Sequence, residues 1–287
     1  MSPAVVVTDS TASLPPEVAD GRGIVVVPLQ VVIGATVYDE GPDGATPEMV
    51  ADALREFRPV STSRPSPAYL AEVYARAAAA GAEEILSIHL SAEMSGTYES
   101  AQLAAREAPV PVTVVDSRQV GVATGYAALS AQDVLDTGGT VAEAAAAARA
   151  RAEMSTALFY VDTLEYLRRG GRIGAAAALL GGALSVKPLL CIDDGRVVNL
   201  DRVRTSARAL SRMEDLTVEK AGDLPIELCV SHLANADRAA DLARQLGDRL
   251  ADNLEGREVW CGELGAVLGA HVGPGMVAVC LAPLLGP

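Results

Sequence analysis

The sequence is poor in aromatic residues and in positive charge, and both shortages argue against whole classes of partner. Aromatic side chains make up 3% of the 287 residues, with one Trp and two Phe, which is too few for the stacking platforms that bind single-stranded nucleic acid. The formal net charge of −14 disfavours nucleic acid and anionic membrane surfaces. No apolar run reaches the length of a membrane span. We therefore expect no nucleic-acid partner and no stable membrane insertion.

Metal and disulfide signatures are also missing. The four cysteines, all in the last hundred residues, include no CxxC pair and match no zinc spacing, and there is no HxH or HExxH. The chain opens almost directly on the strand-like Ala4–Val7, without a basic or apolar leader. We expect free thiols, no metal, no cofactor and a cytoplasmic location.

Three common catalytic or nucleotide-binding motifs are absent. There is no GxxxxGK[ST], the only lysines being Lys187 and Lys220, and there is no GxSxG. The glycine-rich Gly170–Gly174 follows the helix-like Leu164–Arg169 rather than a strand, so it indicates a helix C-terminal turn and not a dinucleotide loop. A bound nucleotide is not expected.

The first half of the chain alternates short β-branched runs with Ala-, Leu- and Glu-rich segments. This pattern predicts a parallel sheet covered by helices on both faces. The predicted strands are Val5–Thr8, Ile24–Ile33, Ile85–Leu90 and Val112–Val115. The predicted helices are Pro47–Phe57, Pro67–Ala80, Thr97–Glu107, Tyr126–Leu135 and Val141–Glu153.

The second half has a different character. Asp193-Asp194-Gly195-Arg196 separates two apolar runs and indicates a β-hairpin, so this half combines α/β units with antiparallel strands. The predicted strands are Ala157–Val161, Leu184–Ile192, Val197–Val203, Ile226–Ser231, Glu258–Cys261 and Val277–Leu281, and the predicted helices are Ser206–Lys220, Asp237–Leu250 and Leu264–Gly269. We predict two α/β domains, residues 1–153 and 154–287.

Four hydroxyl-rich loops are predicted in the first half, each after a strand and before a predicted helix. They are Thr8–Thr11, Ser61–Ser63, Ser91–Thr97 and Asp116-Ser117. Ser and Thr hydroxyls and helix N-terminal amides bind anions, but the same residues also serve as plain helix caps. The segment Leu90–Ala101 is the richest of them, and it predicts an anion site unless these hydroxyls are caps only.

His271 is the histidine most suited to a functional role. It lies in Ala270–Gly275, which we interpret as a rigid glycine-proline loop before the last strand. His89 and His232 fall in or after strands and are expected to be packed or surface histidines. Ser95 with His271 could form the nucleophile and base of a lipid hydrolase or acyltransferase. The sequence has no nucleophile-elbow motif and offers no clear acid partner for His271, and both absences count against that alternative.

Several strings, taken together and in order, resemble the DegV-like fatty-acid-binding proteins, the acyl carriers of bacterial fatty acid kinase. The resemblance covers nearly the whole chain. It rests on Thr8–Thr11, Ser61–Ser66, Leu90–Tyr98, Leu164–Ile173, Lys187-Pro188, Val203–Thr205 and His271–Gly275.

This resemblance implies a carrier without catalysis of its own: two α/β lobes with a long-chain fatty acid between them, its acyl chain in an apolar tunnel to which the second lobe contributes. The carboxylate would be held by Thr62 and Ser95, with His271 nearby, and a separate fatty acid kinase would phosphorylate it to an acyl phosphate. The further residues implied at the ligand are Ser10, Ser63, Gly96 and Thr97, and those implied at the kinase are Arg172 and Arg204. We expect a monomer.

The sequence departs from the family pattern at a few positions near the expected head group. Arg64 stands where Gln is frequent, and Ala92 where a second Ser is common. Met276 follows the Gly-Pro-Gly where a small residue is usual. Glu93 adds a negative charge that would repel a carboxylate unless its side chain points to solvent.

Overall fold

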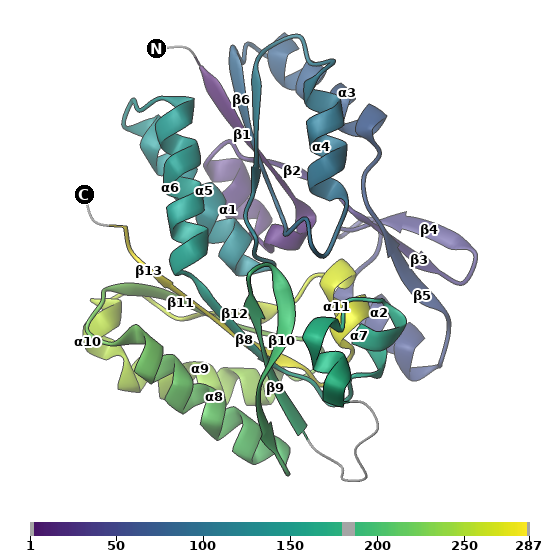
Figure 1. Cartoon of the computed structure of the whole chain (residues 1–287), viewed down its shortest axis with the longest axis vertical. Helices are drawn as coiled ribbons and strands as arrows, with labels where there is room; N and C mark the ends of the chain where they lie inside the picture. The colour runs from purple at the N-terminus through teal and green to yellow at the C-terminus, as the bar shows by residue number, and fades with distance from the viewer. Residues whose placement is uncertain (1–2, 180–186, 286–287) are drawn as a thin grey trace. The chain divides into compact units, whose positions relative to one another are not determined.

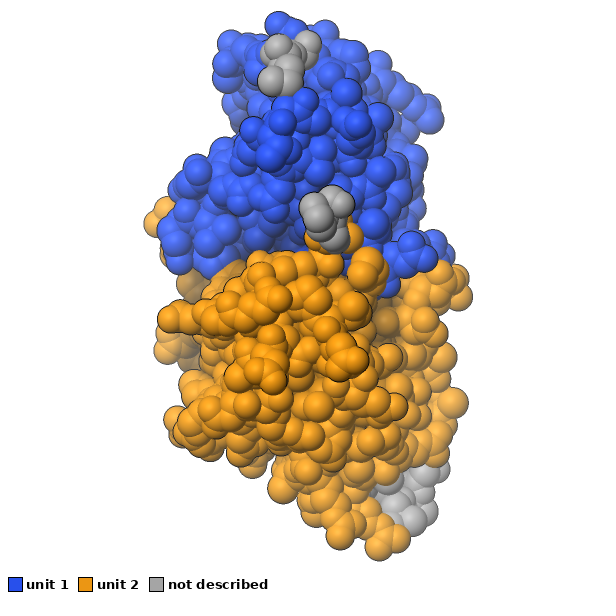
Figure 2. Space-filling view, turned by 90° about the vertical axis from the view of Figure 1, so that its left-hand side faces the viewer, with its two compact units in different colours: residues 1–30, 63–153 blue, residues 31–62, 154–287 orange. Residues whose placement is uncertain are grey.

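A computed structural model of the chain describes residues 3–179 and 187–285. They separate into two compact units, coloured in Figure 2. Unit 1 comprises residues 1–30 and 63–153, and unit 2 comprises residues 31–62 and 154–287. The second unit resumes where the sequence places a domain boundary, but residues 31–62, with Thr62 among them, group with the C-terminal part of the chain.

Unit 1 is built on a four-stranded, all-parallel sheet in the order β2-β1-β6-β7. Its strands are β1 (Ala4–Asp9), β2 (Val25–Val27), β6 (Glu84–His89) and β7 (Val112–Asp116). Its helices are η1 (Ser10–Ala12), α1 (Pro16–Gly21), α3 (Pro67–Ala79), α4 (Thr97–Ala105), α5 (Val122–Asp136) and α6 (Val141–Met154). The predicted parallel, helix-covered sheet is confirmed.

Neighbouring residues of each central strand enter different cores, because side chains alternate across a strand. Val6 and Leu86 pack with α5 and α6 on one face, while Val7 and Ile85 pack with α3 and α4 on the other. Figure 1 shows the two helical layers on either side of β1 and β6. Both faces of the sheet are therefore buried, which directs its ligand-accessible groups to the strand ends.

Unit 2 contains a mixed six-stranded sheet and a small three-stranded one. The larger has the order β10-β9-β8-β13-β11-β12, with β11 and β12 parallel and the other pairs antiparallel. Its strands are β8 (Thr156–Tyr160), β9 (Lys187–Asp193), β10 (Arg196–Val203), β11 (Ile226–His232), β12 (Trp260–Glu263) and β13 (Val277–Pro283). The smaller sheet has the order β4-β3-β5, from β3 (Gln30–Ile33), β4 (Thr36–Asp39) and β5 (Val60–Ser63).

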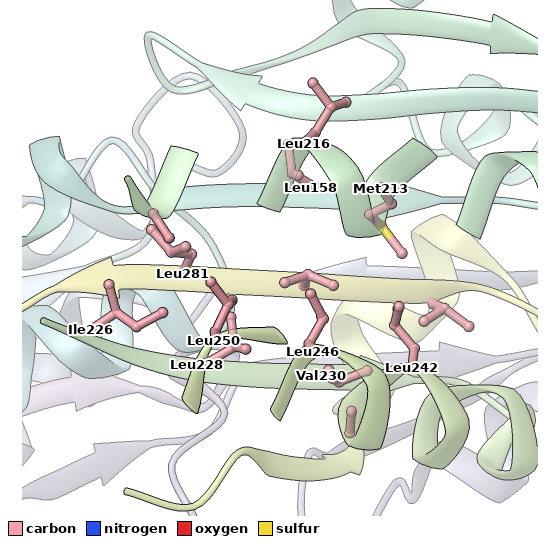
Figure 3. Close-up of a cluster of buried hydrophobic side chains, with 14 of the residues drawn as sticks. Leu158, Met213, Leu216, Ile226, Leu228, Val230, Leu242, Leu246, Leu250 and Leu281 are labelled. Carbon is pink, nitrogen blue, oxygen red and sulfur yellow. The ribbon is translucent and has the colours of Figure 1, made fainter. Parts of the chain in front are cut away.

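Two long helices cover one face of the larger sheet. Leu242 and Leu246 of α9, and Leu250 just after it, pack with Leu228 and Val230 of β11 in a core that also takes in α8 (Figure 3). The helices of unit 2 are α2 (Pro47–Arg55), α7 (Glu165–Arg169), η2 (Gly174–Leu179), α8 (Ser206–Ala221), α9 (Ala236–Arg249), α10 (Ala251–Leu254) and α11 (Ala266–Val272). The predicted antiparallel character of this half is confirmed.

Several turns follow the predicted chemistry. Asp194 and Gly195 have φ of 48° and 78°, as the two central residues of a type I′ hairpin turn require. The Ser66 side chain caps α3 through the Tyr69 amide, with Pro67 in the first turn. Ser13 before Pro15 also has the sequence pattern of a helix cap, but it is the left-handed residue that ends η1, and α1 begins after Pro15 without a side-chain cap.

Other local predictions are wrong for identifiable reasons. The single strand expected over Ile24–Ile33 is two strands of different sheets, separated around Pro28, which lacks an amide donor and restricts the residue before it. Ser61–Ser63 lie on strand β5 and not in a loop. His271 lies in the last turn of α11 and not in a loop. Leu184 and the two residues after it fall outside the described residues.

Over residues 3–179 and 187–285, no helix combines the length and the hydropathy that crossing a bilayer requires.

Candidate functional site

The carboxyl ends of the parallel strands bring the hydroxyl-rich segments of unit 1 to one edge of its sheet. Pairing of Thr8 with Ile88 and of His89 with Asp116 aligns the ends of β1, β6 and β7. Hydrogen bonds tie the loop after β6 to its neighbours: the Ala92 amide donates to the Asp116 carboxylate at 3.2 Å, the Ser91 amide to the Gln119 carbonyl at 2.8 Å, and the Leu90 amide to the Asp9 carboxylate at 3.1 Å. This edge is where an α/β sheet binds ligands.

Ser95 and Thr97 lie at the start of α4, as the sequence predicts. The Ser95 Oγ atom is 2.9 Å from the Thr97 Oγ1 atom and accepts the Thr97 amide at 3.4 Å. Thr97 is fully buried, whereas Ser95 is half-buried. If the Thr97 hydroxyl donates to Ser95, the Ser95 proton is left to donate to a ligand. The arrangement offers one neutral donor at the positive end of a nine-residue helix.

Gly96 is required by a close approach of the Arg64 side chain. A Cβ atom at position 96 would lie 1.5 Å from the Arg64 Nη1 atom and 2.6 Å from its Cζ atom. The guanidinium of the exposed Arg64 side chain therefore lies directly against Gly96, the residue before α4. The sequence places Arg64 outside the family pattern but does not reveal this contact, which puts a guanidinium group against Gly96, the residue after Ser95.

The remaining predicted residues of unit 1 have structural partners. The Ser10 Oγ atom accepts the Leu29 amide at 3.0 Å, and the exposed Ser63 hydroxyl donates to the Arg64 carbonyl at 3.3 Å. Glu93 is exposed, so solvent screens the repulsion between its charge and a nearby carboxylate.

In unit 2, Thr62 and His271 are brought together although 209 positions separate them in the chain. The Thr62 Oγ1 atom, on β5, lies 2.9 Å from the His271 Nε2 atom, on α11. The Glu40 carboxylate accepts the Val267 amide at 2.8 Å, so it caps the helix that carries His271. Thr62 and His271 are thus a predicted pair of site residues, far apart in the sequence, that the structure shows in direct contact.

The His271 ring is held neutral. Burial, and then the positive charge of Arg172, lower the pKa of His271 to about 4. Its Nδ1 atom is buried without a hydrogen-bond partner among the described residues. An unsatisfied N–H would cost more there than an unsatisfied lone pair, which favours the tautomer with the proton on Nε2. That proton donates to Thr62, and the Thr62 hydroxyl is then free to donate outward.

Gly170 makes room for this ring. A Cβ atom at position 170 would lie 2.2 Å from the His271 Nδ1 atom. Gly170 follows α7, and the left-handed Gly171 ends the turn, with the Arg172 amide bonded back to the Leu167 carbonyl. The predicted helix C-terminal turn is confirmed, and it also shapes the histidine site.

The two predicted partner-binding arginines have different surroundings. Arg204 is exposed just after β10. Arg172 is half-buried, and its Nη1 atom donates to the Gly170 carbonyl at 2.6 Å. Their proposed role toward a partner stays a prediction.

Comparison with known proteins identifies the family. The profile of the DegV family, described as uncharacterised proteins, matches residues 3–284. The chain belongs to the DegV family. It is 51% identical over 275 residues to a DegV domain-containing protein of Streptomyces coelicolor, covering 96% of each chain, and 31% identical over 278 residues to the protein DegV of Bacillus subtilis, covering 96% and 97%.

Solved structures of DegV proteins share the fold along the full chain. A fatty-acid-binding DegV family protein of Thermus thermophilus superposes with a TM-score of 0.91 at 35% identity, and DegV of Bacillus subtilis, a fatty acid binding protein, with 0.90 at 30% identity. Both cover 99% of this chain and 100% of their own. The family predicted from the sequence is confirmed, and with it the combination of a parallel-sheet part and a part with antiparallel strands.

The Ser95/His271 hydrolase alternative lacks support in the geometry of this DegV chain. A serine nucleophile needs a histidine base whose second ring nitrogen is oriented by an acid. The His271 Nδ1 atom has no hydrogen-bond partner in the described part of the chain, and the Nε2 atom faces Thr62. The Ser95 hydroxyl is bonded to Thr97.

A different Asp-His-Ser chain lies in unit 1, and the sequence reading missed it. The Asp9 carboxylate is 2.9 Å from His89 Nδ1, and His89 Nε2 is 2.8 Å from the Ser87 Oγ atom, which is 2.8 Å from the Tyr74 hydroxyl. All four side chains are fully buried, so no substrate reaches them. Burial raises the pKa of Tyr74 to about 12. The network joins the ends of β1 and β6 and is structural.

Among the described residues, no group of three or more His, Cys, Asp or Glu side chains is placed to hold a metal ion. All four cysteines are free, as predicted, although Cys261 is exposed and Cys191 only half-buried.

Proposed function

We propose that this DegV-family chain binds a long-chain fatty acid and acts as a carrier without chemistry of its own. The observation that carries the proposal is the Thr62–His271 pair, 2.9 Å apart, in a chain whose fold matches fatty-acid-binding DegV proteins along 99% of its length. A neutral imidazole orients the hydroxyl, and the hydroxyl is a neutral donor suited to a carboxylate oxygen.

Thr62 and Ser95 are the proposed carboxylate ligands, with His271, Gly96, Thr97, Ser63 and Ser10 in supporting positions. Each hydroxyl that donates to a charged oxygen contributes about 1.5–3 kcal/mol. An acyl chain of about 15 methylenes, at about 0.8 kcal/mol each, contributes on the order of 12 kcal/mol gross when buried in an apolar tunnel. The acyl chain therefore supplies most of the affinity, and the hydroxyls set the orientation of the head group.

Neutral donors also fit a carrier that hands its ligand on. A bidentate arginine would neutralise the carboxylate and hold both of its oxygens, whereas two hydroxyls leave the carboxylate charged and nucleophilic.

We propose that a separate fatty acid kinase phosphorylates this carboxylate, and that Arg172 and Arg204 serve the encounter with the kinase. Arg204→Ala should then leave the lipid content unchanged and lower the yield of acyl phosphate. Loss of lipid in Arg204→Ala would assign this residue to the ligand instead.

The primary test is extraction of lipid from the purified, denatured protein, followed by mass spectrometry and by palmitate binding to the delipidated protein. Thr62→Val, which keeps the shape and removes the hydroxyl, should weaken palmitate binding about tenfold or more. Thr62→Ser, which keeps a hydroxyl, is the matched control and should bind close to wild type. Ser95→Ala should act in the same direction.

Three outcomes would contradict the carrier proposal. Absence of bound lipid under every loading condition would exclude fatty acid as the ligand. Equal palmitate affinity of Thr62→Val and wild type would remove Thr62 from the site. An acyl ester on Ser95, seen as a mass adduct of the intact protein, would favour the hydrolase or acyltransferase.

A further inference from the structure

Unit 2 contains a cavity of about 460 Å³ whose wall is cationic. Three arginines line it, Arg58, Arg169 and Arg172, and Thr62 and His271 lie at the same wall. Among the described residues that line the cavity, none is an Asp or a Glu, in a chain with 37 acidic residues and a net charge of −14. Three positive charges gathered without a lining carboxylate indicate an anionic ligand.

Two of the arginines keep donors available for that ligand. Arg169 uses its Nε atom on the Glu165 carboxylate at 2.7 Å, and its terminal nitrogens have no protein partner among the described residues. Arg58 approaches Glu56 only loosely, at 3.8 Å between charged atoms, and both side chains are more than half exposed. Glu165 and Glu56 are not among the residues that line the cavity, so they pair with these guanidinium groups without occupying the site.

The rim of the cavity is apolar on the side of α2. Phe57 lines it with 85% of its surface exposed. This residue takes the left-handed conformation, with φ of 57°, at the position after a helix where glycine is usual. The turn is a Schellman motif, since the Phe57 amide bonds to the Leu54 carbonyl and the Arg58 amide to the Ala53 carbonyl. A large aromatic side chain held in this conformation at a cationic cavity is suited to a ligand with an apolar part.

The charge and shape of the ligand follow from these groups. Guanidinium groups match the oxygens of phosphate through paired N–H donors. A phosphate monoester carries about −1.5 to −2 at neutral pH, compared with −1 for a carboxylate, so its attraction to three cations is roughly twice as large. The volume exceeds what a phosphate group fills, which leaves space for a substituent against Phe57 and its apolar neighbours.

We propose that this cavity binds a phosphate monoester with an apolar substituent, with Arg58 and Arg169 as its principal phosphate ligands. The proposal goes beyond fatty acid binding, because it assigns a second class of ligand to unit 2 and concerns arginines that the carboxylate does not need. It stands if fatty acid binding fails, since Arg58 and Arg169 are not among the residues proposed to bind the carboxylate.

The test compares octyl phosphate with octanoate by calorimetry on the full, delipidated chain. These probes share the alkyl group and differ in the oxyanion. We expect octyl phosphate to bind about tenfold tighter or more than octanoate, and Arg58→Gln and Arg169→Gln each to remove most of that preference. Arg168→Gln is the matched control, because Arg168 pairs with the same Glu165 carboxylate at 2.7 Å but does not line the cavity.

The outcomes separate this proposal from the fatty acid proposal. Failure of octanoate and palmitate to bind, with octyl phosphate still binding through Arg58 and Arg169, overturns only the fatty acid carrier. Equal affinity for octyl phosphate and octanoate overturns the phosphate site. A preference that survives in the Arg58→Gln/Arg169→Gln double variant also overturns it. If inorganic phosphate binds as tightly as octyl phosphate, the proposal that the ligand has an apolar substituent is overturned. If the protein binds phosphatidic acid vesicles but not monomeric octyl phosphate, the proposal that the ligand is a free small molecule is overturned.

Discussion

The burial of His271 makes the stability of unit 2 depend on pH in a predictable direction. Its pKa is about 4 in the folded chain, compared with an ordinary 6.5. The unfolded chain therefore takes up a proton near pH 6.5 that the folded chain refuses until about pH 4. Because the folded pKa is the lower one, this stabilisation is fully present above pH 6.5 and is lost as the pH falls. The loss amounts to about 2 kcal/mol by pH 5 and about 3 kcal/mol by pH 4.

Urea unfolding at pH 7.5, 6.0 and 5.0 measures this loss. The single tryptophan, Trp260, lies on β12 in the same unit as His271, so its fluorescence follows the relevant unit. His271→Gln removes the titrating group, and the wild type should lose about 2 kcal/mol more than this variant between pH 7.5 and 5. His232→Gln, the matched control, should retain the wild-type loss. Equal losses in the wild type and His271→Gln would refute a neutral, buried His271.

Three further substitutions test the packing around the sites. Asp9→Ala leaves the donors that now bond to the carboxylate, including His89 Nδ1, unsatisfied in a buried core. It should lower the unfolding free energy by about 3–5 kcal/mol, measured by urea titration with circular dichroism. A loss below about 1 kcal/mol would contradict a structural role for the network. Gly96→Ala should displace the Arg64 guanidinium and weaken palmitate binding. The same substitution in an Arg64→Ala chain should weaken palmitate binding less. Equal losses of affinity in the two backgrounds would argue against the clash. Phe57→Gly removes the left-handed strain of a bulky residue and should raise the unfolding free energy by about 1 kcal/mol, whereas Phe57→Ala, which keeps the strain, should give no such gain.

The sequence predicts most helices and strands because the central strands of unit 1, buried on both faces, are short continuous apolar runs between helical segments. In β1, Val6 and Val7 enter different cores, and the Asp-Gly hairpin at Asp194-Gly195 has its required φ values. The strands that the sequence reading missed, β4 and β5, are short and polar. Their burial patterns are largely exposed or intermediate, so they carry no apolar signal, and their position depends on pairing with β3.

The site is only partly predictable from local pattern. Nothing local links Thr62 to His271, because the contact spans 209 positions and depends on residues 31–62 grouping with the second unit. The His89 network did leave a signal. Ser87 and His89 are two positions apart on a buried strand, so they share a face, and buried polar groups on one face need partners. Asp9, at the end of the neighbouring parallel strand, is the group that meets this need.

Arg172 connects the neutral and the cationic parts of unit 2. Its guanidinium lines the cavity, and its charge contributes to the lowered pKa of His271. If His271 were protonated at neutral pH, its Nε2 atom would still donate to Thr62, but the charged imidazolium would compete for a carboxylate as an ion pair. Because the charge of Arg172 disfavours protonation of His271, the Thr62 hydroxyl remains the group that donates to a carboxylate. The charge that makes the cavity fit for a phosphate group is thus the same charge that leaves the neighbouring pair neutral.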